Sequence, residues 1–251
     1  MHSGDTIRAL NSLTGKVAFV TGGARRIGRA IVLALADAGA DVVFCSRSES
    51  PAAAQTLRLI ADRGRRGQFL ICDVRSERSV QQAVADIVEQ FGRIDIVVNN
   101  AARFEQVPLG SVTVEQWDAV FETNTRGPFL VVREALVHLR SVSGRVVNIG
   151  SLGGVNAWAT HGHYCASKAA LHMLTETMAK AFAPEVSVNC VAPGWIEFAE
   201  FGVDQAAHFA AITPMRRNGT GEDVAAAVLF FASGPAFITG QTLVVDGGLG
   251  L

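Results

Sequence analysis

Tyr164 and Lys168, in the run Tyr-Cys-Ala-Ser-Lys, are the two residues of this chain whose types and spacing most clearly suggest chemistry. Residues four positions apart lie on one face of an α-helix, with their Cβ atoms about 6 Å apart. An ammonium near a phenol favours the ionised form, so we expect Lys168 to lower the pKa of Tyr164 from its usual value of about 10. The pair could therefore give or take a proton near neutral pH.

The elements that must position this pair alternate between short apolar runs and longer segments with helical periodicity. The apolar runs predict strands, and the periodic segments predict helices. Buried strands that alternate with helices predict an α/β fold of the Rossmann type, a doubly wound parallel sheet with helices on both faces. Ligands of such sheets bind beyond the carboxyl ends of the strands. Strands are predicted at residues 16–21, 41–45, 68–72, 94–98, 145–149, 186–191 and 241–245, and helices at 26–38, 80–91, 114–139, 166–182 and 223–232.

Length and charge narrow the class of protein further. The chain has 251 residues and no linker-like segment divides it, so we expect a single domain over residues 1–251. Its net charge is −1, with 22 basic and 23 acidic residues. Such a balance creates no field that would attract nucleic acid or an anionic membrane. The arginine-rich run at residues 63–67 is interpreted as a solvated turn between a helix and a strand.

The ends and the cysteines suggest a soluble protein of the cytoplasm. The first residues lack the apolar core of a signal peptide, and no apolar run approaches the roughly 18 residues that span a bilayer. Cys45, Cys72, Cys165 and Cys190 are scattered and form no Cys-x-x-Cys pair. We therefore expect reduced thiols and no metal site.

The first predicted strand ends in a glycine-rich turn, Thr21-Gly-Gly-Ala-Arg-Arg-Ile-Gly28, where a helix begins. Glycines let the backbone approach a pyrophosphate, and the free amides of the helix start attract its negative charge. The turn therefore predicts a dinucleotide site that includes Gly22, Arg25, Arg26, Ile27 and Gly28.

The end of the second strand indicates which nicotinamide cofactor binds. NAD enzymes usually carry a carboxylate here for the ribose 2′-hydroxyl, whereas a 2′-phosphate requires cations. This chain has Ser46, Arg47 and Ser48 at this point, and Arg25 and Arg26 add positive charge from the first turn. A planar guanidinium suits phosphate well, so the sequence favours NADP(H).

Taken together, these motifs resemble those of the short-chain dehydrogenase/reductase family of about 250 residues, over nearly the whole chain. Each motif is weak alone, but their joint order and spacing are specific. The matching residues are Thr21-Gly22 with Gly28, Asp73, Asn99-Asn-Ala101, Asn124, Ser151, Tyr164 with Lys168, Pro193-Gly194, Thr239-Gly240 and Asp246-Gly-Gly248.

The resemblance implies a role for each catalytic residue. Tyr164 would exchange a proton with the substrate oxygen, and Lys168 would lower its pKa and bind the nicotinamide ribose. Ser151 would polarise the substrate oxygen, and Asn124 would hold a water that links Lys168 to solvent. An alkoxide that develops during hydride transfer needs such preorganised donors.

The resemblance also assigns the rest of the cofactor site and the assembly. Asp73 and Val74 would bind the adenine, and Asn100 and Ala101 would lie on the adenosine ribose side. Asn99 is expected to hold strands together instead. A homotetramer is implied, paired through the helices near 114–139 and 166–182 and through the last strand. The nicotinamide carboxamide would be held by Pro193, Gly194 and Ile196.

Two positions depart from the family pattern. Arg26 replaces the usual middle glycine of the turn, as in pteridine reductases, but those enzymes generally carry an aspartate where this chain has Ser151. The combination favours reduction of a ketone over reduction of a pterin. Phe198 stands where a threonine often binds the carboxamide, so orientation of the nicotinamide would depend more on the Ile196 backbone.

Residues 195–217 correspond to the substrate lid of the resembled fold. Glu197, Glu200 and Asp204 suggest an acidic outer surface on this lid. Its aromatic residues either line an apolar pocket or only pack on the body, and the sequence leaves both readings open. The candidates to line the pocket are Phe104, Leu152, Trp158, His161, Trp195 and Phe198.

The leading hypothesis is an NADPH-dependent oxidoreductase that reduces a ketone of a small molecule to an alcohol. A 3-oxoacyl-[acyl-carrier-protein] reductase is the first alternative, although an acidic lid would repel an acidic carrier protein. Pteridine reductase is the second. A regulatory or scaffold protein that only binds NADP is the alternative outside enzymes, and it would not need the full set of Asn124, Ser151, Tyr164 and Lys168.

Overall fold

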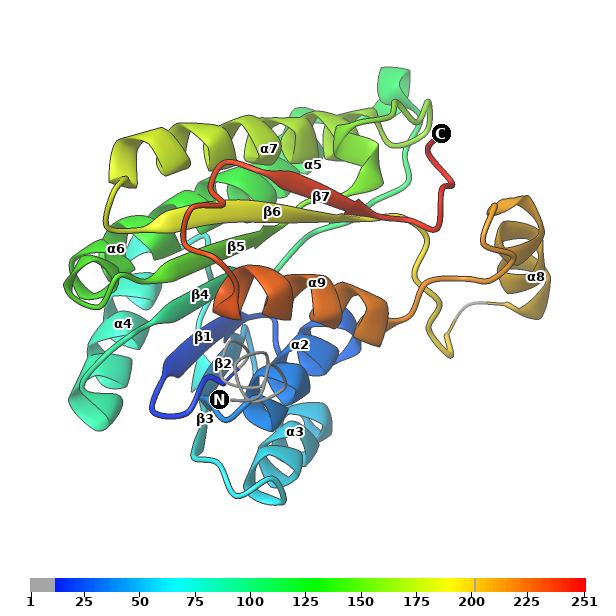
Figure 1. Cartoon of the computed structure of the whole chain (residues 1–251). Coiled ribbons are helices and arrows are strands. Elements are labelled where there is room, and N and C mark those ends of the chain that lie inside the picture. The colour runs from blue at the N-terminus through cyan, green and yellow to red at the C-terminus, as the bar shows by residue number, and fades with distance from the viewer. Residues whose placement is uncertain (1–11, 201) are drawn as a thin grey trace.

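One sheet of seven parallel strands forms the centre of the computed structural model, which describes residues 12–200 and 202–251. The strand order is β3-β2-β1-β4-β5-β6-β7 (Figure 1). Each predicted strand is present to within two residues, and the predicted fold class is confirmed. The strands are β1 Val17–Thr21, β2 Asp41–Ser46, β3 Gly67–Ile71, β4 Ile96–Asn99, β5 Arg145–Ile149, β6 Ser187–Pro193 and β7 Thr242–Val245.

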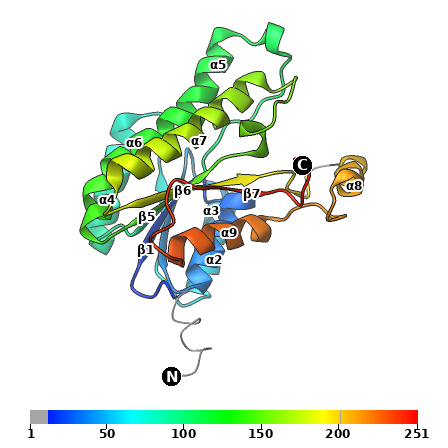
Figure 2. The same cartoon turned by 45° about the horizontal axis from the view of Figure 1, so that its top comes forward.

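Helices cover both faces of this sheet, as Figure 2 shows. The first face carries α2 Arg26–Asp37, α3 Pro51–Ala61 and α9 Gly221–Ser233, and the second carries α4 Glu77–Phe91, α5 Val114–Phe121, α6 Gly127–Ser141 and α7 Gly162–Phe182. Two apolar cores result, one on each side of the strands. The central strands are buried on both faces, which explains their continuous apolar sequence.

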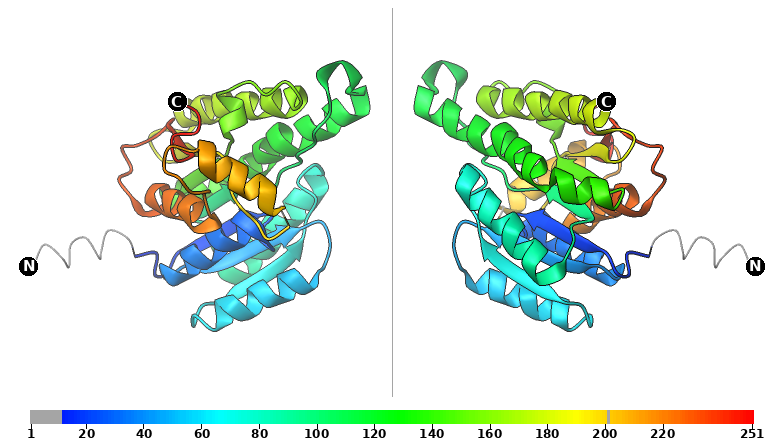
Figure 3. Two further views of the ribbon diagram at one scale, coloured as in Figure 1. Left: turned by 90° about the vertical axis from the view of Figure 1, so that its right-hand side faces the viewer. Right: turned by 90° about the vertical axis from the view of Figure 1, so that its left-hand side faces the viewer.

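The winding of the chain reverses between β1 and β4. Strand β1 pairs with β2 on one side and with β4 on the other. The loops that follow these two strands therefore turn toward opposite faces of the sheet and leave a crevice between them. Figure 3 shows α8 Val203–Ile212 standing near this end of the sheet, apart from the two helical layers.

The single helix predicted over residues 114–139 is instead three elements. A capping box of Thr113 and Gln116 starts α5, and a π-helical turn, Glu122–Arg126, separates it from α6. A π turn inserts an extra residue, and such turns are frequent at functional sites. Periodicity alone could not detect it, because the apolar pattern continues through both helices.

Two helices were not predicted, and the ends of two others differ. Helix α3 starts at a Ser50 cap followed by Pro51, and α8 lies in the segment predicted as a lid. Helix α7 begins at Gly162 and α4 at Glu77, several residues earlier than their apolar patterns. The first turn of α4 is polar and does not contribute to an apolar periodicity. The start of α7 agrees with the placement of Tyr164 and Lys168 on one helical face.

The arginine-rich turn before β3 pairs with carboxylates of the same chain. Arg63 donates to Asp37 at 2.7 Å, and Arg65 and Arg66 both donate to Asp41 at 2.8 and 2.7 Å. The predicted turn is thus correct, and these three charges are already satisfied.

Several predictions concern features that we expect to be absent. In the described part of the chain, no helix is long and apolar enough to span a membrane. No group of three His, Cys, Asp or Glu residues within 12–200 and 202–251 could hold a metal ion. All four cysteines are free and buried. Residues 1–11, where no signal peptide is expected, and residue 201 of the predicted lid lie outside the described residues.

Replacement of Gly28 by alanine is expected to disrupt the first turn. A Cβ there would lie 2.1 Å from the carbonyl oxygen of Gly22 and 2.6 Å from Nδ2 of Asn100. A backbone atom cannot move aside cheaply, so we expect a loss of about 2 kcal/mol or more in stability and weaker dinucleotide binding. Thermal unfolding and NADPH titration measure both. Gly110→Ala, where nothing lies within 4 Å, is the matched control, and equal behaviour of the two variants would contradict the prediction.

Candidate active site

One cleft of about 1600 Å³ at the carboxyl ends of the strands brings the predicted site residues together. All the predicted cofactor residues and all six predicted pocket residues line it. Ser151, Tyr164 and Lys168 line it as well, whereas Asn124 does not and is fully buried. Phe209, one of the lid aromatics, lines it too, whereas sequence reasoning missed several lining residues that have no family motif of their own, among them Arg75, Arg103, Gln106, Asn156 and Gln205.

Tyr164 lies in the first turn of α7, enclosed by aromatic rings. The edge of its ring meets Phe104, with centroids 4.9 Å apart, and Trp158 stacks at 6.3 Å. Burial raises the pKa of Tyr164 to about 12, and a hydrogen bond with Ser151 only partly offsets this. The phenol is therefore held in its neutral, proton-bearing form.

Lys168 lies one turn further along α7, and its Nζ is 5.8 Å from the centroid of the Tyr164 ring. Its ammonium donates to the carbonyl oxygen of Ile149 at 2.7 Å, and burial lowers its pKa to about 8. Burial raises the pKa of Tyr164, so the lowering predicted from Lys168 is not found in this structure. Desolvation disfavours the charged form of each group, the phenolate and the ammonium.

Ser151 follows β5, and hydrogen bonds of its hydroxyl and of its backbone N–H fix its position. Its Oγ accepts from the N–H of Gly153 at 3.0 Å, and its own N–H points to Nε2 of His172 at 3.4 Å. Burial lowers the pKa of His172 to about 4, and the Lys168 charge adds to this effect. The imidazole is therefore neutral at physiological pH, with Nε2 available as an acceptor.

Acidification is expected to destabilise the protein through His172. Its pKa in the folded chain lies below the unfolded value of 6.5. The unfolded chain thus binds more protons between these values, and stability falls as the pH decreases through that window. The loss from about pH 7 to about pH 5 is expected to be about 2 kcal/mol. Urea unfolding at both pH values tests this, and a His172→Gln variant with the same pH dependence as the natural chain would refute it.

Asn124 lies in the π-helical turn, and both polar groups of its side chain form hydrogen bonds. Its Oδ1 accepts from the N–H of Arg103 at 2.8 Å, and its Nδ2 donates to the Arg103 carbonyl at 2.9 Å and to Ser167 Oγ at 3.0 Å. Ser167 in turn donates to the carbonyl of Tyr164 at 2.7 Å. The asparagine therefore ties the loop after β4 to the catalytic helix.

The first turn is braced by the residue pair that follows β4. Nδ2 of Asn100 donates to the carbonyls of Thr21 and Gly22, each at 3.0 Å. Oγ1 of Thr21 accepts from the N–H groups of Asn100 and Ala101, also at 3.0 Å. Gly22 has a φ of +69°, which favours glycine. Asn100 thus shapes the turn in addition to lining the cleft.

Asn99 has the structural role that was predicted for it. Its side chain donates to Asn148 on β5 at 2.8 Å, and Asn148 donates to Thr175 on α7 at 2.9 Å. This buried series of hydrogen bonds holds β4, β5 and the catalytic helix in register.

Arg25 and Arg47 are the cations at the adenosine end of the cleft. Neither guanidinium donates a hydrogen bond or forms an ion pair with any residue in 12–200 or 202–251. Ser46 Oγ, in contrast, donates to the carbonyl of Ser48 at 2.7 Å and closes the turn between them. Both arginines are thus available for an anionic ligand.

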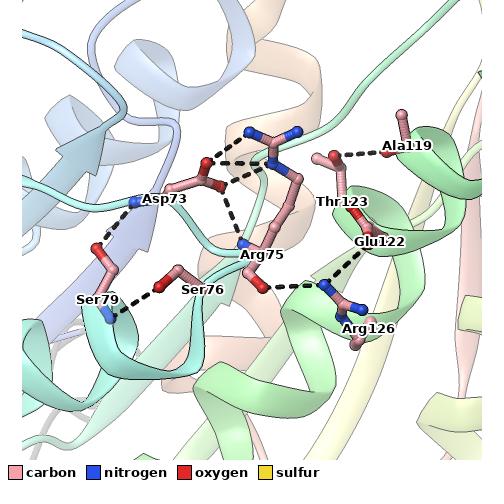
Figure 4. A network of polar contacts seen from close by, with 8 residues as sticks. All are labelled: Asp73, Arg75, Ser76, Ser79, Ala119, Glu122, Thr123 and Arg126. Atoms are coloured by element: carbon pink, nitrogen blue, oxygen red, sulfur yellow. Dashed lines mark hydrogen bonds and ion pairs between the residues drawn. The ribbon is translucent and has the colours of Figure 1, made fainter. Parts of the chain in front are cut away.

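Asp73, assigned to the adenine by resemblance, is paired with Arg75 (Figure 4). The guanidinium donates to both carboxylate oxygens, at 3.0 and 2.6 Å, and this holds the pKa of Asp73 below its usual value. The carbonyl of Arg75 accepts from Arg126, which also pairs with Glu122 of the π-helical turn. Any ligand that Asp73 binds must therefore share the carboxylate with Arg75.

The segment after β6 carries the residues assigned to the carboxamide. A Cβ at Gly194 would lie 2.5 Å from that of Asp246, so this turn packs closely on the end of β7. Ile196 forms a parallel bridge with Gly219, which closes the base of the predicted lid. Trp195 stacks on Phe209 of α8, with centroids 4.0 Å apart. Trp195, Phe198 and Phe209 line the cleft, whereas Ile212 and Met215 are exposed.

Comparison with known proteins identifies the relatives of this chain. The family model described as "Enoyl-(Acyl carrier protein) reductase" matches residues 22–250. The short-chain dehydrogenase/reductase eriH of Hericium erinaceus is 38% identical, covering 92% of this chain and 96% of its own length. A 3-oxoacyl-[acyl-carrier-protein] reductase of Synechocystis is 36% identical, covering 96% and 99%.

A solved structure agrees with the fold and the site. A gluconate 5-dehydrogenase from Burkholderia cenocepacia, in complex with NADP and tartrate, superposes with a TM-score of 0.90. It is 32% identical and covers 97% of this chain and 98% of its own. With the tyrosine, lysine and serine meeting in one cleft beside the glycine turn, and relatives matched over nearly their whole length, the chain belongs to the short-chain dehydrogenase/reductase family of oxidoreductases.

Proposed function

We propose that the protein is an NADPH-dependent reductase that converts a ketone of a small molecule to an alcohol. The observation that carries this proposal is the joint content of one cleft. A neutral Tyr164 and Ser151 lie at one end, and Arg25 and Arg47 lie at the other, without a hydrogen bond or ion pair from either guanidinium to residues 12–200 or 202–251. Members of the family interconvert alcohols and carbonyl compounds. A tyrosine that holds its proton favours reduction, because reduction requires a proton to be donated to the substrate oxygen.

NADP(H) is the cofactor that the cleft fits best. Arg25 and Arg47 would bind a 2′-phosphate, and the turn from Gly22 to Gly28 would bind the pyrophosphate through backbone amides. The complex of the Burkholderia relative with NADP supports the same choice. When bound, the reduced cofactor would supply the hydride.

The chain's own residues supply the proton and the stabilising charges. Ser151 Oγ and the Tyr164 hydroxyl would both donate hydrogen bonds to the carbonyl oxygen of the substrate. Burial keeps the proton on Tyr164 until that oxygen gains negative charge and becomes the stronger base. Lys168 would then stabilise the phenolate. Both side-chain groups of Asn124 are used, so a water that it holds would bind its backbone carbonyl.

Consumption of NADPH by purified protein tests this function. The panel should include cyclic and aromatic ketones, an acetoacetyl thioester, a dihydropterin and a simple diketone. We expect turnover with one or more ketones and loss of turnover in Tyr164→Phe. If no carbonyl compound reacts while NADPH binds, and Tyr164→Phe retains the cellular effect of the protein, the regulatory or scaffold role becomes the better proposal.

A 3-oxoacyl-[acyl-carrier-protein] reductase is the second candidate. The Synechocystis relative favours it, and the family model is likewise described by a substrate on the acyl carrier protein, although by reduction of an enoyl group. The acidic lid opposes a carrier protein less than its composition suggests, because Glu200 pairs with Arg26 and Glu197 accepts from Asn218. Faster turnover with the acetoacetyl carrier protein than with the small thioester would select this function. Pteridine reductase ranks lower, since Ser151 replaces the usual aspartate.

The assembly, the lid and the location are also proposals. We propose a homotetramer because apolar side chains lie exposed on the helices and the strand that would pair. Val137 of α6 is 67% exposed, Met173 of α7 is 60% exposed, and Leu243 of β7 is 41% exposed. Light scattering tests this assembly. We also propose that residues 195–217 form the substrate lid of a single domain, and that the protein is cytoplasmic.

A further inference from the structure

Arg26, in the glycine-rich turn, forms an ion pair with Glu200 of the predicted lid. Its φ is +52°, in the left-handed region that glycine adopts freely and that other residues rarely adopt. Glycine usually stands here in the family, and it would meet this backbone requirement without strain. The arginine side chain therefore has a use that offsets the cost of its backbone conformation.

The contacts of this side chain lie in the first arm of the lid, residues 196–200. Nε of Arg26 donates to Oε1 of Glu200 at 3.1 Å. The guanidinium also lies over the ring of Phe198, 5.6 Å from the centroid. Both departures from the family pattern, Arg26 and Phe198, thus meet in one contact between segments more than 170 residues apart in the sequence.

The far end of the lid is fixed separately, since the N–H of Met215 donates to the carbonyl of Gly247 at 3.1 Å. Helix α8, between the two ends, has no buried residue, and it lies at the margin of the molecule in Figure 1. Asn218, just past the lid, donates to Glu197 at 2.7 Å. Phe198, by contrast, packs against the apolar core that includes residues of α2.

We propose that Arg26 is a positioning residue that fixes residues 196–200 to the cofactor-binding turn and thereby sets how tightly the substrate binds. This inference rests on the proposed function, since it concerns the same cleft. Arg26 and Phe198 line that cleft together, so an ordered arm presents Phe198 and Trp195 to the substrate in one arrangement. Arg26 also pairs with Glu200, and this carboxylate would otherwise act on the charge of Arg25 in the same turn.

Steady-state kinetics at saturating NADPH test the proposal with Arg26→Gln, Glu200→Gln and the double variant. An exposed ion pair and an exposed cation–π contact are both modest, so we expect the KM for the carbonyl substrate to rise about fivefold. In Glu200→Gln, the kcat should stay within about twofold, because Glu200 does not line the cleft and no group at the reacting atoms changes. The KM of the double variant should be no higher than that of Arg26→Gln, since both single changes break the same ion pair.

Two further variants distinguish positioning from general damage. Arg26→Lys keeps the charge but not the planar stacking, so its KM should lie between those of the natural chain and Arg26→Gln. Asp204→Asn, which removes an exposed carboxylate of the same lid that makes no ion pair, should leave KM unchanged. An unchanged KM in Glu200→Gln, or effects that multiply in the double variant, would overturn the proposal.

Hydrogen exchange gives a readout that needs no turnover. With NADPH bound to the full chain, amides of residues 196–200 should exchange about fivefold faster in Arg26→Gln and Glu200→Gln than in the natural chain or Asp204→Asn. Equal exchange in all four proteins would refute the role of Arg26. If no ketone is turned over by the natural chain, the proposed function fails. Hydrogen exchange still tests whether Arg26 orders residues 196–200.

Discussion

The Tyr164→Phe variant is expected to lose reductase activity by a factor of about 10² to 10⁴ in kcat, with its NADPH affinity nearly unchanged. That range is the usual contribution of a positioned general acid. The hydroxyl is a buried proton donor that hydrogen-bonds with Ser151, and its removal leaves the developing alkoxide with one hydrogen bond instead of two. Single-turnover oxidation of NADPH measures the chemical step directly.

The change removes one oxygen from a ring that stays packed between Phe104 and Trp158, so the fold should not be affected. Thermal unfolding within about two degrees of the natural chain would establish this point. A Tyr164→Phe protein that retains more than about a tenth of the activity would show that another group donates the proton. The proposed mechanism would then be wrong.

The double variant Arg25→Gln/Arg47→Gln is expected to lose most of its preference for NADPH. A hydrogen bond from a charged group contributes about 1.5–3 kcal/mol, so two of them lost should lower kcat/KM for NADPH about a hundredfold or more. The value for NADH should change little, because NADH has no 2′-phosphate. The ratio of the two kcat/KM values is therefore the measurement, and it is independent of enzyme concentration.

The matched control for this prediction is Arg78→Gln. Arg78 lies in the first turn of α4, is exposed and does not line the cleft, so its loss changes the net charge without changing the site. It should leave the cofactor ratio as it is in the natural chain. If the double variant also keeps its ratio, neither arginine binds a 2′-phosphate, and the cofactor preference must have another origin.

Much of the fold could be predicted, because its signals are local. The apolar run of each strand reports burial on both faces, so β5 was predicted with its true ends. The predicted start of α4 was too late, because the residues of its first turn are polar. The π-helical turn at Asn124 was missed because one inserted residue hardly changes an apolar pattern that continues on both sides.

The sequence predicted which residues line the candidate site, but not which of them contact one another. Asp73 and Arg75 are two residues apart, yet only the structure shows that the guanidinium covers both carboxylate oxygens. Arg25 and Arg47 belong to the same residue type and line the cleft, but neither guanidinium forms an ion pair within the described part of the chain. A count of charges cannot separate an arginine that is already bound from one that is available, since the difference depends on which segments pack nearby.

The sequence by itself determined the class of the sheet, the glycine turn and the set of groups that could transfer a proton. Periodicity and residue type are local properties, and they carry this information in full. The tertiary structure decided the state of those groups. Burial, which no spacing reports, raises the pKa of Tyr164 instead of lowering it. The contact of Arg26 with Phe198 and Glu200 likewise exists only because the chain folds two distant segments onto one cleft.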